Sequence, residues 1–182
     1  MEGRPPGEHE LVLRAQRGDE HAFRSLVEAH WETAFRLAYV ITRNPTDAED
    51  ATQDAFVKAW RALHRFRPSE PLRPWLLRIA ANEARNRRRS GGRRAQLTLR
   101  AERAQLSGDA APSPEDLVVA RDERARLLAE LDELPEAARI VLACRYLLDL
   151  SEAETAAALG VRVGTVKSRS ARALDRLREI HG

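Results

Sequence analysis

Apolar residues recur at helical spacing along most of the chain, and the clearest such stretch lies near the C-terminal end. Ser151 is followed three residues later by Glu154, which together form the sequence pattern of a capping box at a helix start. Gly160 follows the last apolar residue of that short helix and suits a left-handed C-cap. The spacing predicts a second helix starting near Thr165, with an apolar face made of Val166, Ala173, Leu174 and Leu177.

Polar and cationic side chains occupy the other faces of this second helix. They are Lys167, Ser168, Arg169, Arg172 and Arg176. A short capped helix, a turn with glycine and a second helix with a cationic face are typical of a helix-turn-helix that binds DNA. The residues alone also allow an ordinary helical hairpin with a solvated basic face, because helix-turn-helix patterns are short and arise by chance.

The N-terminal part predicts a series of amphipathic helices. A short helix is expected from about Glu10 to Arg17, and Asp19 is expected to cap a long helix that ends before Asn44-Pro45. Thr46 and Glu49 are expected to cap the next helix as a second capping box. The apolar face of that helix is Ala55, Phe56, Ala59, Trp60 and Leu63.

Acidic residues lie opposite this apolar face. Acidic side chains in a first helical turn are favoured by the helix dipole, which accounts for Asp47, Glu49 and Asp50. The dipole does not account for Asp54, which lies two turns into the helix. The acidic face is therefore either a solvated surface or a docking site for a basic partner, and the local pattern favours solvation.

A loop with two prolines, residues 66–73, leads into an arginine-rich helix. Its apolar residues begin with Trp75 and Leu76, and six arginines then fall within ten residues: Arg85, Arg87, Arg88, Arg89, Arg93 and Arg94. This density exceeds what pairing within a helix needs, and it predicts a phosphate-binding surface. Asn82 and Asn86 lie one turn apart and could bond to bases; a solvated basic helix end is the alternative.

The stretch from Ser90 to Pro114 is rich in glycine, proline and polar residues, which predicts a linker, with a helix allowed near Gln96–Gln105. A helix is expected over 115–131, and Pro135 opens another that holds Ile140, Val141, Cys144 and Leu148. Cys144 lies in an apolar run and is expected to be buried. One cysteine excludes an intrachain disulfide, and no signal peptide or long apolar span is apparent.

Composition adds little to this interpretation. The 31 Lys and Arg residues against 28 Asp and Glu give a net charge of +3, which fits a nucleic-acid partner without requiring one. No phosphate-binding glycine loop, histidine cluster or nucleophile motif is present in the sequence. We therefore expect no catalytic residues, no metal and no cofactor, and a cytoplasmic protein without membrane insertion.

The order of these features resembles the extracytoplasmic-function (ECF) group of bacterial sigma factors. The similarity extends over roughly residues 10–89 and 123–178, and its most specific parts are DAEDATQDAFVKAW (47–60) and LSEAETAAALGVRVGTVKSRSARALDRLR (150–178). GDEHAFRSLVEAH (18–30) is similar to the opening helix of the family, and residues 66–89 to its promoter −10 segment. Arg162 and Ser170 depart from the usual pattern, which places Ser and an aliphatic residue there.

The resemblance implies an all-α protein with two small helical domains joined by a flexible linker. Its domains are a disordered N-terminus (1–9), a sigma region 2-like domain (10–90), the linker (91–114) and a region 4-like helix-turn-helix domain (115–182). It implies a transcription initiation factor that binds the β′ and β subunits of core RNA polymerase and promoter DNA, assists promoter melting, and is open to control by an anti-sigma factor. The alternative is a helix-turn-helix regulator that acts without core polymerase.

The resemblance also assigns roles to three sets of residues. The core polymerase would be bound by Asp47, Glu49, Asp50, Gln53 and Asp54. The −10 element would be bound by Phe66, Arg73, Arg78, Asn82, Arg85, Asn86, Arg87, Arg88 and Arg89. The −35 element would be bound by Arg162, Thr165, Lys167, Ser168, Arg169 and Arg172.

Overall fold

The structure is a computed structural model that describes residues 7–101 and 134–181, and all of its regular elements in these ranges are helices. The first range holds α1 (Glu8–Gln16), α2 (Glu20–Thr42), α3 (Pro45–Ala62), the 3-10 turn η1 (Leu63–Arg65) and α4 (Leu72–Ala101). The second holds α6 (Glu136–Leu142), the π-helical turn η2 (Ala143–Leu147), α7 (Glu152–Leu159) and α8 (Val163–His181). The prediction of an all-α fold is confirmed.

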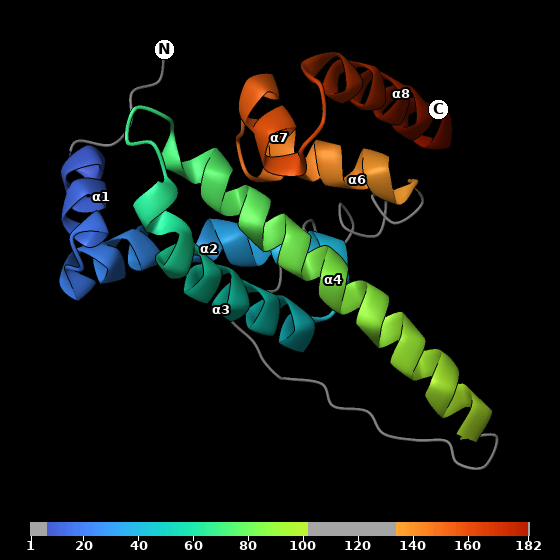
Figure 1. Cartoon of the computed structure of the whole chain (residues 1–182). Helices are drawn as coiled ribbons and strands as arrows, with labels where there is room; N and C mark the ends of the chain where they lie inside the picture. The colour runs from blue at the N-terminus through green and yellow to red at the C-terminus, as the bar shows by residue number, and fades with distance from the viewer. Residues whose placement is uncertain (1–6, 102–133, 182) are drawn as a thin grey trace, which may run out of the picture.

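Helices α2, α3 and α4 pack against one another, and α1 packs against α2 (Figure 1). Their shared core contains fully buried apolar side chains such as Leu37, Ile41 and Leu77, with many alanines that let the helices approach closely. Asp19 caps α2 as predicted, because its carboxylate accepts from the backbone N–H groups of His21 and Ala22. The same carboxylate has a lowered pKa, first because of the Ala22 bond and then because of Arg14.

The start of α3 differs from the predicted capping box at Thr46. Asn44 is the N-cap, and its side-chain oxygen accepts from the backbone N–H of Asp47 at 3.0 Å. Pro45 occupies the first helical position, where its missing N–H removes no intrahelical bond. Thr46 and Glu49 are exposed residues within the helix. The prediction of a second capping box was wrong because the proline fixes the helix start two residues earlier.

Helices α7 and α8 form the predicted helix-turn-helix. Ser151 and Glu154 make both bonds of the capping box, at 3.2 and 2.8 Å, and Gly160 ends α7 with φ of 67°. The backbone at Gly160 therefore lies in the left-handed region that glycine enters without a steric penalty. Helix α8 starts at Val163, two residues before the predicted position, and it packs on both α6 and α7.

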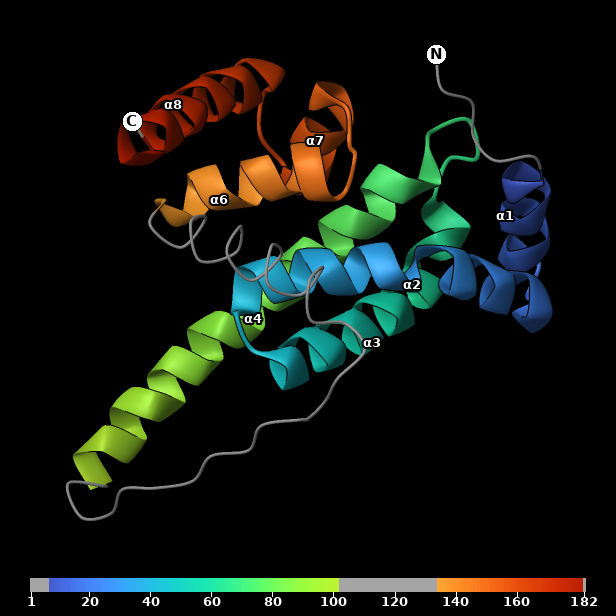
Figure 2. The same cartoon turned by 180° about the vertical axis from the view of Figure 1, so that it is seen from behind.

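The α6–α8 group packs directly on the α1–α4 group. Helix α7 contacts α4, and α6 and η2 contact α2, so α3 and α6–α8 lie on opposite sides of α4 (Figures 1 and 2). One cluster of buried apolar residues includes members from both groups, among them Ala81 and Ala84 of α4 and Ile140 and Cys144 from the other side. Cys144 is fully buried, as predicted.

Two segment boundaries bear on the predicted domains. Helix α1 starts at Glu8, inside the predicted disordered N-terminus, and the buried carboxylate of Glu8 lies 2.9 Å from Nε2 of His30, within hydrogen-bond distance. Helix α4 continues to Ala101, so the first residues of the predicted linker are helical. The rest of the predicted linker, the predicted helix over 115–131 and residues 1–6 lie outside the described residues. Within the ranges described, no helix is long and apolar enough to cross a membrane.

Ser170 gives a stability prediction. Its hydroxyl oxygen is buried without a hydrogen-bond partner, and such a group carries its full desolvation cost. Ser170→Ala removes the unpaired hydroxyl and raises helix propensity, so we expect unfolding to cost roughly 1 kcal/mol more. Thermal or urea unfolding of the two proteins measures the change. Lower stability of the Ser170→Ala variant would contradict the burial of an unpaired hydroxyl.

Candidate protein and nucleic-acid interfaces

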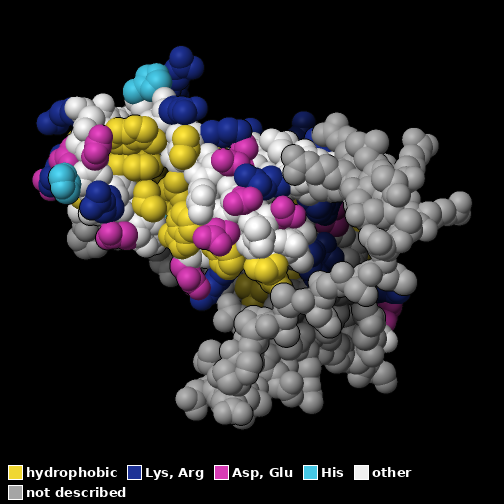
Figure 3. Space-filling model, turned by 90° about the horizontal axis from the view of Figure 1, so that it is seen from below, with side chains coloured by type: hydrophobic (Ala, Val, Ile, Leu, Met, Phe, Trp, Pro, Cys, Tyr) yellow, Lys and Arg dark blue, Asp and Glu magenta, His cyan; other side chains and the backbone are white. Residues whose placement is uncertain are grey.

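The acidic face of α3 lies on the molecular surface. Glu49, Gln53 and Asp54 are exposed, whereas Asp47 and Asp50 are partly buried. Viewed from this side, acidic and basic side chains gather next to a patch of exposed apolar side chains (Figure 3). The structure brings all five predicted polymerase-binding residues together on one helix, as their spacing requires.

Arg87 of α4 is bound to this acidic face. Its two terminal nitrogens, Nη1 and Nη2, lie 2.6 Å from a carboxylate oxygen of Asp50 and 2.8 Å from one of Asp54. The pKa of the Arg87 guanidinium is raised, first by the hydrogen bond to Asp54 and also by the charge of Asp50. Lys58 and Glu83 form a further ion pair between α3 and α4 at 2.6 Å. Arg87 was predicted to bind the −10 element, but in this arrangement it faces α3.

The other arginines of α4 point in different directions. Arg88 pairs with Glu136 of α6 at 2.6 Å. Arg85 is partly buried beneath the same group, and this burial lowers the pKa of its guanidinium, against the opposing effect of the Glu136 charge. Arg89 is exposed, as are Asn82 and Asn86. The arginines of the predicted phosphate-binding run therefore lie in three different environments: against α3, against the α6–α8 group and in solvent.

The first turns of α4 are also covered by the α6–α8 group. Arg73 donates to the backbone oxygen of Leu148 at 2.5 Å. The guanidinium of Arg78 lies beside Gly160, where a Cβ atom would be 3.8 Å from its Nε. Three of the arginines predicted to contact the −10 element, Arg73, Arg85 and Arg88, are thus engaged by the α6–α8 group, while Arg78 lies beside that group and remains exposed.

Phe66 requires a correction. It was expected to contact the −10 element, but its ring is only 5% exposed and lies in a cluster with Leu63 and Leu72. The ring packs against Trp75 with centroids 4.9 Å apart. The loop that begins at Phe66 is anchored by this contact and by Gln16, whose side-chain amide donates to the carbonyl oxygens of Leu63 and Phe66. Phe66 supports the loop from the core side, where Trp75 packs against it.

The residues predicted to contact the −35 element lie on and just before α8. Arg162, Lys167, Ser168 and Arg172 are exposed, and Thr165 and Arg169 are partly buried. Lys167 lies 3.5 Å from Glu152 of α7. Arg172 donates from Nε to the backbone oxygen of Ser168 at 3.1 Å.

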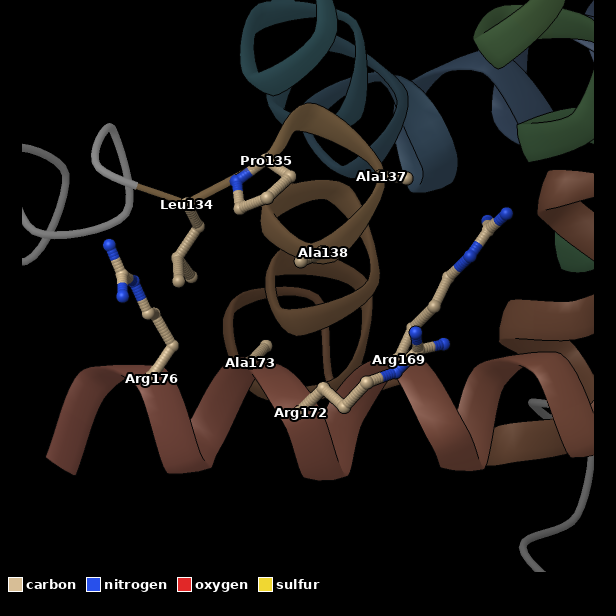
Figure 4. A pocket seen from close by; sticks show the side chains of 8 residues that line it. All are labelled: Leu134, Pro135, Ala137, Ala138, Arg169, Arg172, Ala173 and Arg176. Carbon is tan, nitrogen blue, oxygen red and sulfur yellow. The ribbon is translucent and has the colours of Figure 1, made fainter. Parts of the chain in front are cut away.

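Arg169, Arg172 and Arg176 also border a hollow of about 670 Å³ between α8 and the start of α6. Figure 4 shows these three side chains extending from α8, with Leu134, Pro135 and Ala138 opposite them. The hollow is therefore apolar on one side and cationic on the other. Arg169 lies partly toward this side of the helix, while Lys167 is exposed to solvent.

Sequence reasoning missed an apolar groove of about 390 Å³ between α2 and α3. It is lined by Phe23, Val27, Phe56, Val57 and Trp60, with Glu20 and Arg24 at its edge. Val57 is 50% exposed and lies one turn beyond Asp54. The sequence contains a signal for it, because Val57 is an apolar residue outside the register of the buried residues Ala55, Phe56 and Ala59.

Comparison with known proteins identifies the family. Residues 26–94 match the description "Sigma-70 region 2", and residues 124–177 match "Sigma-70, region 4". The chain is 36% identical to the RNA polymerase sigma factor NccH of Alcaligenes xylosoxydans over 95% of its length and 94% of that protein. It is also 36% identical to the ECF RNA polymerase sigma-E factor of Escherichia coli K12 over 91% of this chain and 89% of that protein.

Structural comparison agrees with these matches. The structure of CnrH in complex with the cytosolic domain of CnrY is similar, with a TM-score of 0.71, 30% identity and 96% of each chain covered. The chain therefore belongs to the ECF group of sigma-70 family RNA polymerase sigma factors. It is a transcription initiation factor that works with core RNA polymerase at promoters, and the matches favour this role over that of a regulator independent of polymerase.

Proposed function

We propose that the acidic face of α3 docks on a basic surface of core RNA polymerase. The observation that supports this most is the placement of Asp47, Glu49, Asp50, Gln53 and Asp54 on one accessible helix face of the region 2 domain. Charges of one sign on such a face speed association with an oppositely charged partner and set its orientation. The neighbouring groove around Val57 adds apolar surface that docking would bury.

The −10 element is then bound by the exposed polar face of α4 and the loop before it. Asn82 and Asn86 face bases, and the arginines neutralise phosphates, as a single strand requires. Because Arg73, Arg85 and Arg88 are engaged by the α6–α8 group in this arrangement, that group has to leave α4 before the strand can reach them. We assign this separation to formation of the complex with polymerase and promoter.

The −35 element is bound by α8, with Lys167 and Arg169 as its main contacts. A helix of this kind enters the major groove with its first turns against the base edges. Each good arginine contact to a base contributes about 1–3 kcal/mol of discrimination. Regulation comes from outside the chain: CnrH was solved with the cytosolic domain of another protein, and we propose that a comparable partner controls this sigma factor.

Run-off transcription tests the function directly. Core polymerase without any sigma factor is combined with this protein on fragments of the source genome, and new discrete start sites are expected. No transcripts despite stable binding to core polymerase would contradict promoter recognition. The reaction chemistry belongs to the polymerase, so this chain has no catalytic role, and it acts in the cytoplasm where polymerase and promoter meet.

The −35 assignment has its own variant. Replacing both Lys167 and Arg169 by alanine should weaken protection of the −35 region in footprints by roughly 10- to 100-fold in affinity, from the loss of one base contact and one phosphate contact. Arg178→Ala is the control, since Arg178 is an exposed arginine of the same helix that pairs with Asp175 at 2.9 Å. Equal protection by the double variant and the control would place −35 recognition elsewhere.

A further inference from the structure

Arg87 connects the two surfaces to which the proposed function assigns polymerase and promoter. It belongs to α4, the helix proposed to follow the −10 strand, yet its guanidinium holds Asp50 and Asp54 of the proposed polymerase-docking face. A basic surface of polymerase that bound these carboxylates would compete with Arg87 for them. In the free protein, Arg87 therefore occupies carboxylates that polymerase would bind, and it is itself not available to the −10 strand.

The geometry points to an exchange of partners at Arg87: polymerase takes Asp50 and Asp54, and the released guanidinium then binds a phosphate of the −10 strand. This inference rests on the docking face proposed above. The exchange itself moves the side chain of Arg87, and the departure of the α6–α8 group proposed above opens α4 to the strand. The positive charges of Arg85, Arg88 and Arg89 repel that of Arg87, and a phosphate bound beside them would relieve this repulsion.

Two features of the contact favour exchange over a purely structural role. The side chain of Arg87 is 33% exposed, and those of Asp50 and Asp54 are 43% and 50% exposed, so solvent screens both ion pairs and they break easily. The third guanidinium donor, Nε, is buried without a hydrogen-bond partner. A structural arginine normally satisfies its buried donors, so the arrangement in the free protein is incomplete.

Exchange also predicts that the two binding events help each other. When polymerase occupies the carboxylates, the protein gains one cation for DNA, and bound DNA that holds Arg87 leaves the carboxylates free for polymerase. Linkage requires the two effects to be equal in size. Arg87 thus occupies the docking carboxylates in the free protein and contacts DNA in the complex.

The test uses the full-length protein with Arg87→Gln. Its affinity for core polymerase, measured by competition against labelled wild-type protein, should rise about three- to ten-fold, because polymerase no longer displaces two surface ion pairs. Arg36→Gln is the matched control, since Arg36 pairs with Glu32 at 2.6 Å on α2, away from both faces, and its loss changes the net charge equally. We expect the control to bind like the wild type.

The same variant should bind DNA less well once polymerase is present. The probe is a short single-stranded DNA with the non-template sequence of a promoter found by run-off transcription. In the holoenzyme, Arg87→Gln should lower the salt dependence of binding by about 0.7 in the slope of log K against log salt, the value for one phosphate contact. Opposite changes in the two affinities are a result that general loss of structure does not produce.

Further variants separate this inference from the docking face itself. If Asp50→Asn with Asp54→Asn binds polymerase normally, the proposed docking face is wrong and the exchange is wrong with it. If that double variant binds weakly but Arg87→Gln leaves polymerase affinity unchanged or lower, the docking face stands and the exchange is overturned. In the double variant, Arg87→Gln should have no further effect on polymerase binding. If Arg87→Gln prevents folding, Arg87→Lys replaces it in the test. Lysine keeps the positive charge but has only one nitrogen, so it cannot hold both carboxylates as the guanidinium does.

Discussion

Replacing Asp50 and Asp54 together by arginine should abolish stable binding to core polymerase, with affinity falling by about 100-fold or more. The substitution removes two carboxylates from the proposed docking face and presents two cations to a basic surface, so attraction becomes repulsion. Loss of hydrogen-bonded charge pairs at an interface costs about 2–5 kcal/mol, which corresponds to this fall. Native gel mobility or competition binding with purified core polymerase measures it.

The two new arginines would also lie beside Arg87, and this repulsion inside the protein needs its own control. Adding Arg87→Glu to the same variant restores ion pairs of inverted sign between α4 and α3. We expect this triple variant to unfold at a temperature close to that of the wild type and still fail to bind polymerase. Recovery of binding by the triple variant would mean that the contact between α3 and α4, and not the acidic surface, is what polymerase needs.

The local sequence predicted a helix end correctly where residues close in the chain determine it. The capping box of Ser151 and Glu154 at the start of α7 is confirmed, and so is Gly160 at its end, because their bonds involve neighbours in the chain. Thr46 was predicted to cap α3, but the structure has Asn44 there. The ring of Pro45 decides between them, since it fits the first helical position and leaves the cap to the residue before it.

The arginine run shows what sequence could not provide. In the chain Arg85, Arg87, Arg88 and Arg89 suggest one basic surface. In the structure, helical rotation turns Arg87 toward α3 and Arg88 toward Glu136 of α6, and only Arg89 of these four is exposed. The direction of each side chain follows from the helical period, but its partner depends on which helices pack on either side of α4. That is long-range information.

The burial of Phe66 and the packing of α6–α8 on α4 likewise depend on contacts that the local sequence does not show. An aromatic residue in a loop with prolines fits base capture and core packing equally well until Trp75 and Leu72 are seen to enclose it. The contact of α7 with α4 links residues more than fifty positions apart in the chain. The arginines of α4 suggest an exposed helix. No local pattern shows that α4 also presents alanines on which α7 can pack.

Cys144 offers a direct measure of whether α6–α8 leaves α4. It is the only cysteine of the chain and is fully buried. Burial raises the pKa of its thiol from 9.0 to about 12, and the opposing effect comes from Arg85 of α4, which places the thiol near the junction of the two groups. Because the thiolate is the form that reacts, the raised pKa and the burial both make this thiol less reactive than an exposed cysteine.

We therefore expect Cys144 of the free protein to react with maleimide at least about 100-fold more slowly than the same residue in denatured protein. In the complex with core polymerase and promoter DNA, the rate should rise by a similar factor, because departure of the α6–α8 group from α2 and α4 exposes the thiol. Mass spectrometry of the peptide that contains Cys144 distinguishes it from the cysteines of polymerase. Protection that is equal in the free protein and in the transcribing complex would mean that the two groups stay together, and the arginines of α4 would then need another route to DNA.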